Sequence, residues 1–194
     1  GRLIFQDKCG LLDLPPPNLP GAHQIQNAGT ALAALRHLAL KESACEAAIT
    51  QAQWPARLQR LREGPLPALA TGAELWLDGG HNPAAGDALA QFLAILPKRP
   101  TYLICGMLNT KDISGYLAPL RAVSETLFSV SIPNEENTLS ADDTACKAAA
   151  VGFDAQSAQT VDAALHAISM QAPHARIVIC GSLYLAGMIL RQNG

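Results

Sequence analysis

The stretch Arg176-Ile177-Val178-Ile179-Cys180, followed by Gly181-Ser182, decides the fold of this chain. Its apolar residues are continuous rather than alternating, and Thr101-Tyr102-Leu103-Ile104-Cys105 repeats the pattern. Continuous apolar runs of this length are typical of parallel strands that are buried on both faces. Further strands are predicted over Glu74–Asp78 and Thr126–Val130, with helical stretches between the strands. This alternation indicates an α/β fold with an open, mostly parallel, Rossmann-like sheet.

The alternation of strands and helices begins after Gly64-Pro65, so a domain boundary is expected near residue 62. Residues 63–194 are predicted to form one complete α/β domain. The helices predicted in it cover Pro83–Ile95, Ile113–Val123, Ala141–Ala150, Val161–Gln171 and Leu183–Gln192.

Residues 1–62 contain too little regular structure for a complete core, and we expect them to be the tail of another domain. Three consecutive prolines at 15–17 exclude a helix or a central strand there. A hairpin is predicted over residues 1–14 with Gly10 in its turn, followed by a helix over Gln26–Leu40. A second helix is predicted from Ser43 to about Ala52, and Ser43 and Glu46 are expected to form a capping box at its start.

The composition excludes several classes of protein. The chain has 194 residues, is 49% hydrophobic and carries a formal net charge of −2, which argues against disorder and gives no electrostatic reason to expect nucleic acid or an anionic membrane as a partner. No apolar run approaches the ~20 residues of a membrane-spanning helix. No metal-ligand spacing and no phosphate-binding loop occur. The cysteines form no C-x-x-C pair and are expected to be reduced, packed thiols of a cytoplasmic protein: Cys9, Cys45, Cys105, Cys146 and Cys180.

Polar residues and glycines follow three of the four predicted strands, where an open α/β sheet binds its ligands. Asp78-Gly79-Gly80-His81-Asn82-Pro83 combines a carboxylate, an imidazole and a flexible turn in front of a helix. Lys111 and Ser182 follow two further strands and could contact an anion. A purely structural interpretation stays open for each motif, with Asn82 and Ser182 as helix caps and Lys111 as a surface charge. Tyr184, Leu185 and Met188 are expected in the core.

Two residues outside these strand ends are also candidates for ligand binding. Asn27 could bind an adenine edge through its amide, and Arg57 could hold a phosphate with two hydrogen bonds. The alternative is that Asn27 is a helix cap and Arg57 a surface charge.

Five short motifs occur in one order between residues 20 and 185. They are Pro20–Ala28 (PGAHQIQNA), Trp54–Gln59 (WPARLQ), Asp78–Pro83 (DGGHNP), Gly106–Leu108 with Lys111-Asp112, and Gly181–Leu185 (GSLYL). Together they resemble the folylpolyglutamate synthase/dihydrofolate synthase family of the Mur ligase group. The resemblance covers the C-terminal half of such an enzyme, and it implies that residues 1–62 end a central ATP-binding domain.

The resemblance implies roles for six residues. Asn27 is expected on adenine, Asp78 on the ribose or the nearby nucleotide, and Arg57 on the phosphates of ATP. His81 is expected near the phosphates and the reacting atoms, so His81 and Arg57 are the catalytic candidates. Lys111 and Ser182 are the candidates for binding the incoming glutamate.

Two departures from the family pattern concern the loops. Gly80 stands where alanine is more common, and Asn109-Thr110 precede Lys111 where an acidic residue is frequent.

The activity that the resemblance implies is an ATP-dependent amide ligase of folate biosynthesis. It would add L-glutamate to dihydropteroate, folate polyglutamate or both, through an acyl phosphate. ATP and Mg²⁺ are the implied cofactors, and the phosphate loop and metal ligands would lie in an N-terminal portion outside this chain. The fragment alone is therefore expected to be inactive, and no stable protein partner is expected. Two alternatives stay open: a Mur-type ligase acting on a cell-wall precursor, and a non-catalytic α/β binding module.

Overall fold

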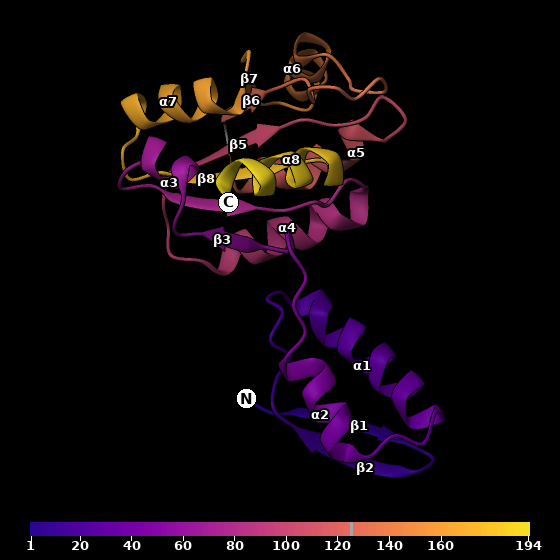
Figure 1. The fold of residues 1–194 in the computed structure, drawn as a ribbon. Coiled ribbons are helices and arrows are strands. Elements are labelled where there is room, and N and C mark those ends of the chain that lie inside the picture. The colour runs from indigo at the N-terminus through magenta and orange to yellow at the C-terminus, as the bar shows by residue number, and fades with distance from the viewer. Residues whose placement is uncertain (125) are drawn as a thin grey trace. The chain divides into compact units, whose positions relative to one another are not determined.

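The computed structural model describes residues 1–124 and 126–194 of the chain. These residues divide into two compact units, Gly1–Pro55 and Ala56–Gly194 (Figure 1). The division lies before residue 62, because β3 (Gln59–Leu61) pairs with β4 (Glu74–Leu77) and so joins the sheet of the second unit. No helix among the described residues is long and apolar enough to cross a membrane.

The first unit packs two helices on a two-stranded hairpin. Strands β1 (Leu3–Asp7) and β2 (Gly10–Leu14) are antiparallel, which confirms the predicted hairpin. Gly10, with φ of 111°, begins the second strand and pairs with Asp7, so it follows the turn instead of lying in it. The buried core is formed by Leu12, Leu14, Ala28, Leu32, Cys45 and Ile49.

The helices of the first unit begin earlier than the sequence pattern predicted. Helix α1 covers Ala22–His37 and starts directly after Gly21, whose φ of 106° turns the chain into the helix. Helix α2 covers Glu42–Thr50 and is preceded by Lys41, without a side-chain cap. The predicted capping box of Ser43 and Glu46 is therefore wrong.

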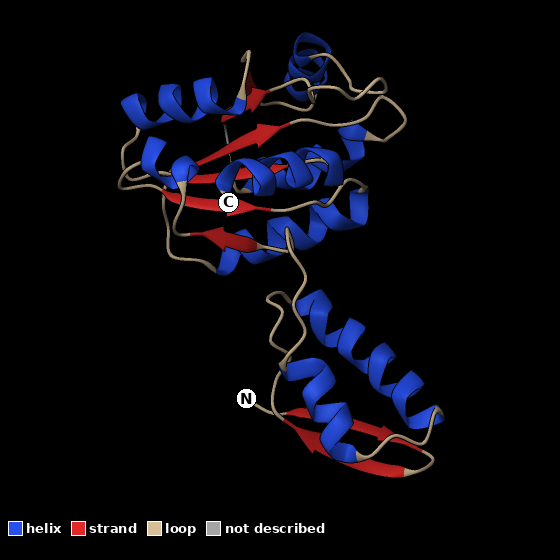
Figure 2. Cartoon of the chain, in the orientation of Figure 1, coloured by secondary structure: helices blue, strands red, loops and turns tan. Residues whose placement is uncertain are grey.

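The second unit contains a six-stranded sheet in the order β3-β4-β8-β5-β6-β7. Figure 2 shows the strands in red with helices beside them. The pairs β4–β8, β8–β5, β5–β6 and β6–β7 are parallel, and among the described strands of this sheet only β3 runs antiparallel. The predicted α/β fold with a mostly parallel sheet is thus confirmed. The strands of this sheet not yet given are β5 (Thr101–Cys105), β6 (Thr126–Ser129), β7 (Asp154–Ser157) and β8 (Arg176–Cys180).

Helices cover both faces of this sheet, as the continuous apolar strands require. In β8, Ile177 and Ile179 pack on one side, while Val178 and Cys180 pack on the other. The first face is covered by α3 (Pro65–Leu69), α7 (Val161–Gln171) and α8 (Leu183–Asn193). The second face is covered by α4 (Pro83–Ile95), α5 (Ile113–Leu117), the 3₁₀ helix η1 (Ala118–Ala122) and α6 (Ala141–Ala150).

Most predicted elements of this unit are confirmed, and the differences have local causes. The helix predicted over Ile113–Val123 changes to 3₁₀ geometry at Ala118, directly before Pro119, which lacks a backbone N–H. Strand β7 was not predicted, because its sequence Asp-Ala-Gln-Ser is polar and lies at the edge of the sheet. Two of the cysteines expected in the core, Cys9 and Cys146, are exposed.

Candidate functional site

A cleft of about 230 Å³ lies at the carboxyl ends of β4, β5 and β8. The three strands are adjacent and parallel, so the segments that follow them meet at one edge of the sheet. The structure therefore brings His81, Lys111 and Ser182 to a single cleft, although 101 positions separate the first from the last. Its full lining consists of His81, Leu108, Thr110, Lys111, Gly181, Ser182, Leu183 and Tyr184.

The segment after β4 presents His81 through a tightly packed turn. Gly79 and Gly80 are both buried, and a Cβ on Gly79 would lie 2.5 Å from a methyl carbon of Leu183. A Cβ on Gly80 would lie 2.8 Å from the Cβ of Ala85 and 2.7 Å from Asp78 Oδ1, so the turn has little room for a larger residue. His81 Nδ1 lies 3.1 Å from the carbonyl oxygen of Gly79. If Nδ1 carries the proton, this bond leaves Nε2 free to accept one at the cleft.

Asn82 caps helix α4, as the structural interpretation of this motif predicted. Its Oδ1 accepts a hydrogen bond from the backbone N–H of Ala85 at 2.9 Å, and Pro83 occupies the first turn. Asn82 therefore fixes the start of α4 and holds the preceding His81 in place.

The segment after β8 places a buried hydroxyl at the base of the cleft. Gly181 has φ of 106°, and a Cβ there would lie 2.9 Å from both Cys105 Sγ and the carbonyl oxygen of Gly106. Ser182 is buried, and its Oγ accepts a hydrogen bond from the backbone N–H of Tyr184 at 3.0 Å. Ser182 is thus a helix cap, while its hydroxyl hydrogen can still be donated to a ligand in the cleft.

The loop after β5 carries Lys111 and is fixed by the loop after β6. The backbone N–H of Asn109 donates to the carbonyl of Asn137 at 2.8 Å, and Leu139 N–H donates to Met107 at 2.9 Å. Asp112 caps α5 by accepting from Gly115 N–H at 2.9 Å. The Lys111 side chain is exposed and forms no ion pair within the described ranges. Its ammonium is consequently available to an anion in the cleft.

Asp78 directly follows β4, and its carboxylate accepts hydrogen bonds from the backbone on both sides of it in the fold. Its Oδ2 accepts from Leu58 N–H at 3.0 Å, and its Oδ1 accepts from Gly80 N–H at 2.8 Å. Arg57 is exposed and follows Ala56, whose carbonyl accepts from Gly79 N–H at 2.8 Å. The structure thus ties the segment that carries Arg57 to the end of β4.

Asn27 belongs to the other compact unit. It is exposed on α1, and its Nδ2 donates to Gln24 Oε1 at 2.9 Å. Together with Gln24 it borders a mainly apolar cavity of about 160 Å³ that includes Pro17, Ala28 and Ile49. Gln24 and Asn27 supply the polar side chains of this lining.

Two buried ionisable groups of this unit, Cys105 and Tyr116, have a raised pKa that favours their neutral form. The thiols of Cys105 and Cys180 occupy paired positions on β5 and β8, and both are buried. A hydrogen bond with Cys180, together with burial, raises the pKa of Cys105 well above its ordinary value. Burial likewise raises the pKa of Tyr116 well above its usual range. These groups contribute packing instead of a nucleophile or a charge.

The structure corrects one expectation about the cleft. Tyr184 and Leu183 are 59% and 52% exposed and line the cleft, although Tyr184 was expected in the core. Their positions just after the Ser182 cap place them at the edge of the sheet, whereas Leu185 faces inward and is buried as predicted.

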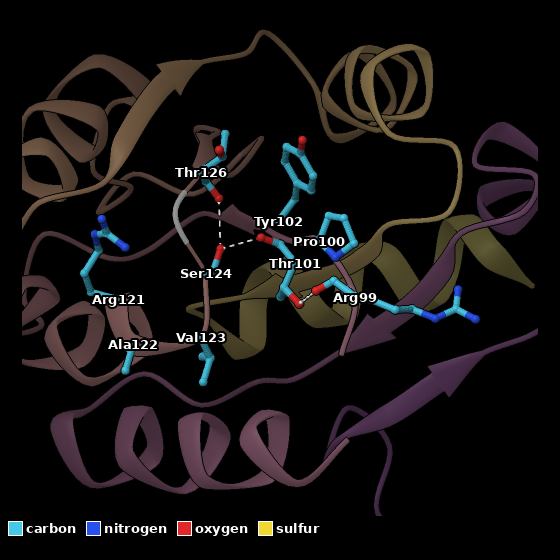
Figure 3. A pocket seen from close by; sticks show the side chains of 9 residues that line it. All are labelled: Arg99, Pro100, Thr101, Tyr102, Arg121, Ala122, Val123, Ser124 and Thr126. Atoms are coloured by element: carbon cyan, nitrogen blue, oxygen red, sulfur yellow. Dashed lines mark hydrogen bonds between the residues drawn. The ribbon is translucent and has the colours of Figure 1, made fainter. Parts of the chain in front are cut away.

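Other hollows lie at the opposite, amino-terminal edge of the sheet. A cavity of about 360 Å³ is lined by Arg99, Thr101, Tyr102, Arg121 and Ser124, among others (Figure 3). Its two arginines are already engaged, since Arg121 donates to the carbonyl of Gly152 and Arg99 to that of His174. The Ser124 hydroxyl donates to the carbonyl of Thr101 at 2.7 Å. Both arginines and Ser124 of this cavity thus form internal hydrogen bonds.

The described residues contain no group of three His, Cys, Asp or Glu side chains that could hold a metal ion. Residues of this part of the chain therefore do not fit a Mg²⁺ site of their own, and no step is assigned to a metal here.

Comparison with known proteins gives a consistent result. Residues 67–192 match the family model described as dihydrofolate synthetase, C-terminal domain. The dihydrofolate synthase/folylpolyglutamate synthase of Escherichia coli (strain K12) is 38% identical over 128 residues, which are 64% of this chain and 28% of that protein.

Solved structures extend the similarity to almost the whole chain. A Mycobacterium tuberculosis folylpolyglutamate synthase complexed with ADP has a TM-score of 0.80 and 27% identity over 95% of this chain and 43% of that one. A bifunctional folylpolyglutamate synthase/dihydrofolate synthase with Mn, AMPPNP and L-glutamate bound has a TM-score of 0.76 and 27% identity over 96% of this chain and 43% of that one. The chain thus spans less than half the length of each of these relatives.

Proposed function

Because this chain belongs to the folylpolyglutamate synthase/dihydrofolate synthase family, as its match to the C-terminal domain of that family shows, we propose that it forms the C-terminal part of an ATP-dependent amide ligase. The enzyme would join L-glutamate to the carboxylate of dihydropteroate, of a folate, or of both. The first compact unit, Gly1–Pro55, would then be the end of the ATP-binding domain, and Ala56–Gly194 the domain that binds glutamate.

The observation that carries this proposal is the cleft at the carboxyl edge, where His81, Lys111 and Ser182 lie together. Lys111 supplies a cation, and Ser182 a hydroxyl with an unused hydrogen, which suits a carboxylate of glutamate. Two of its lining residues are the exposed Leu183 and Tyr184, which can contact the aliphatic part of the same ligand.

The proposed reaction has two steps. The γ-phosphoryl group of ATP passes to the pteroate or folate carboxylate, which yields an acyl phosphate and ADP. The glutamate amine then attacks the acyl carbon, the C–N bond forms, and inorganic phosphate leaves. Arg57 would offset the negative charge that develops on the transferred phosphoryl group, and His81 would lie beside the reacting atoms.

The remaining nucleotide contacts follow from the two units taken separately. Asn27 would bind adenine at the apolar cavity that it borders on the first unit. Asp78 would lie near the ribose, with ATP and a divalent cation as the cofactors of the complete enzyme. A structurally similar enzyme that binds Mn, AMPPNP and L-glutamate supports this set of ligands.

The test is an assay of the complete protein that contains this sequence, with ATP, Mg²⁺, L-glutamate and dihydropteroate. We expect glutamate-dependent release of ADP and phosphate together with a new amide product. A correctly folded protein that makes no such product, but ligates an amino acid to a cell-wall precursor, would favour the Mur-type alternative. Turnover that is unchanged in His81→Ala would favour a non-catalytic role for this cleft.

A further inference from the structure

We propose that Gln59 and Asp78 are positioning residues that hold the turn carrying Arg57 from its two sides. The inference rests on the proposed function, which assigns Arg57 to the phosphates of ATP. It adds one residue, Gln59, to which the motif comparison gave no role, and gives the Asp78 carboxylate a second task besides the nucleotide.

The turn around Arg57 has an unusual backbone. Ala56 and Leu58, the residues on either side of it, have φ values of 57° and 46°. Residues with a Cβ rarely adopt this left-handed conformation, because the side chain crowds the backbone. Within the described ranges, non-glycine residues with positive φ number four, and two of them flank Arg57. Such a turn needs outside contacts to keep its shape.

Gln59 supplies the first contact. Its side-chain Oε1 accepts a hydrogen bond from the backbone N–H of Ala56 at 2.8 Å. The backbone of Gln59 is itself fixed, because it pairs with Leu77 in the antiparallel β3–β4 ladder. The amide oxygen therefore reaches back from a rigid strand and closes the turn in front of Arg57.

Asp78 supplies the contact on the other side. Its Oδ2 accepts from the N–H of Leu58 at 3.0 Å, and the N–H of Gly79 donates to the carbonyl of Ala56 at 2.8 Å. Asp78 is buried, and its Oδ1 is oriented by the N–H of Gly80 at 2.8 Å. Both neighbours of Arg57 are thus bound to the end of β4, directly before His81.

The Arg57 side chain depends on these backbone contacts for its position. It is exposed, and its guanidinium has no hydrogen-bond or ion-pair partner in the described part of the chain. A fixed backbone lowers the entropy that must be lost when the guanidinium binds a phosphate. Loosening the turn should therefore weaken ATP binding without removing any group that touches ATP.

The experiment compares two substitutions of Gln59 in the complete protein. Gln59→Leu removes the acceptor, whereas Gln59→Glu keeps an oxygen at the same place. We expect Gln59→Leu to raise the KM for ATP about tenfold, with a smaller effect on the KM for glutamate. In Gln59→Glu, the KM for ATP should stay close to the wild-type value. Hydrogen–deuterium exchange should show faster exchange of the peptide over residues 54–59 in Gln59→Leu alone.

A double-mutant cycle separates positioning from a general structural role. In the Arg57→Ala background, Gln59→Leu should cause little further increase in the KM for ATP, because the guanidinium that Gln59 helps to position is already absent. A full additional increase in that background would overturn the inference. So would an unchanged exchange rate at residues 54–59, since the turn would then not depend on Gln59.

Failure of the inference can be told apart from failure of the proposed function. If the wild-type protein shows no glutamate-dependent release of ADP, the proposed function is wrong and the positioning role falls with it. If the wild type is active and Arg57→Ala is impaired, but Gln59→Leu is as active as Gln59→Glu, only the positioning role is wrong.

Discussion

Both edges of the central sheet carry charged residues and hollows, but the two edges differ in the ion pairs that these residues form. At the amino-terminal edge, Glu74 lies within 4 Å of three guanidinium groups, with distances of 3.3 Å to Arg60, 3.8 Å to Arg99 and 3.2 Å to Arg176. At the carboxyl edge, Lys111 forms no ion pair within the described ranges.

The volume of the hollows does not favour the carboxyl edge. The hollows at the amino-terminal edge measure about 360 and 570 Å³, whereas the cleft at the carboxyl edge measures about 230 Å³. At the amino-terminal edge, Arg60, Arg99 and Arg176 are engaged by Glu74. The exposed Lys98 beside the larger hollow forms no ion pair within the described ranges. The carboxyl edge therefore differs less in having a free cation than in bringing that cation together with the imidazole of His81 and the hydroxyl of Ser182 in one cleft.

The largest effect is expected at Lys111. Replacing Lys111 with alanine in the complete protein removes the cation that we assign to glutamate, so kcat/KM for glutamate should fall about 100-fold. The matched control is Lys98→Ala, an exposed lysine beside a hollow of the amino-terminal edge. Steady-state kinetics at saturating ATP measure both. Equal losses in the two variants would remove the functional distinction between the edges.

Glu74→Gln tests the structural character of the amino-terminal edge. Three arginines lose their shared counter-ion, and Arg176, whose side chain is 3% exposed, keeps only its bond to the carbonyl of Pro97. Because Arg60 and Arg99 are partly exposed to solvent, we expect a loss of about 2.5 kcal/mol in the free energy of unfolding, less than for a fully buried pair. Urea denaturation measures it, and the exposed Glu136→Gln serves as control. Loss of activity in folded protein would contradict this assignment.

Two glycine substitutions probe the carboxyl edge at a finer scale. Gly181→Ala forces a Cβ into contact with Cys105 Sγ at a φ of 106°, so it should cost about 2 kcal/mol of stability. Gly187→Ala, in the same helix-bearing segment, meets only Arg191 at 3.6 Å and should be neutral or slightly stabilising. Thermal unfolding of both variants decides the point. Similar melting temperatures would mean that the turn at Gly181 is not tightly packed.

The smallest effect is the pH dependence of stability at Glu74. Burial raises the pKa of Glu74, but the charges of Arg60, Arg176 and Arg99 outweigh it and hold the pKa below the ordinary value of 4.5. The stabilisation from the ionised carboxylate is therefore complete above that value and is lost as the pH falls through the lower pKa of the folded state. The stability difference between wild type and Glu74→Gln should shrink below about pH 4.5. A stability difference between the two proteins that stays constant down to pH 3 would contradict this pH dependence.

Much of the fold could be predicted from the sequence, because its signals are local. Helix α4 begins and ends as expected, since Asn82 caps it and Pro83 occupies its first turn. The central strands β5 and β8 also have the predicted bounds, because both are apolar throughout. Strands β3 and β7 lie at the edges of the sheet, where burial is weaker and the apolar signal is lost.

The site could be predicted in part, through the rule that ligands bind at the carboxyl ends of parallel strands. That rule correctly placed His81, Lys111 and Ser182 at one edge. The hydrogen bond between Asp78 and Leu58 spans 20 residues and depends on the pairing of β3 with β4, so no local pattern reveals it. Tyr184 was wrongly expected in the core, because the spacing of apolar residues along α8 does not show which turn of the helix lies beyond the edge of the sheet.

The most direct test of the difference between the edges is hydrogen–deuterium exchange of the complete protein, with and without AMPPNP, Mg²⁺ and L-glutamate. We predict slower exchange on ligand addition in the peptides over residues 106–112 and 181–184, and unchanged exchange over residues 99–102 and 121–123. Protection confined to the amino-terminal edge, or absent from both edges in a protein that binds the nucleotide, would contradict the assignment of the cleft to substrate binding.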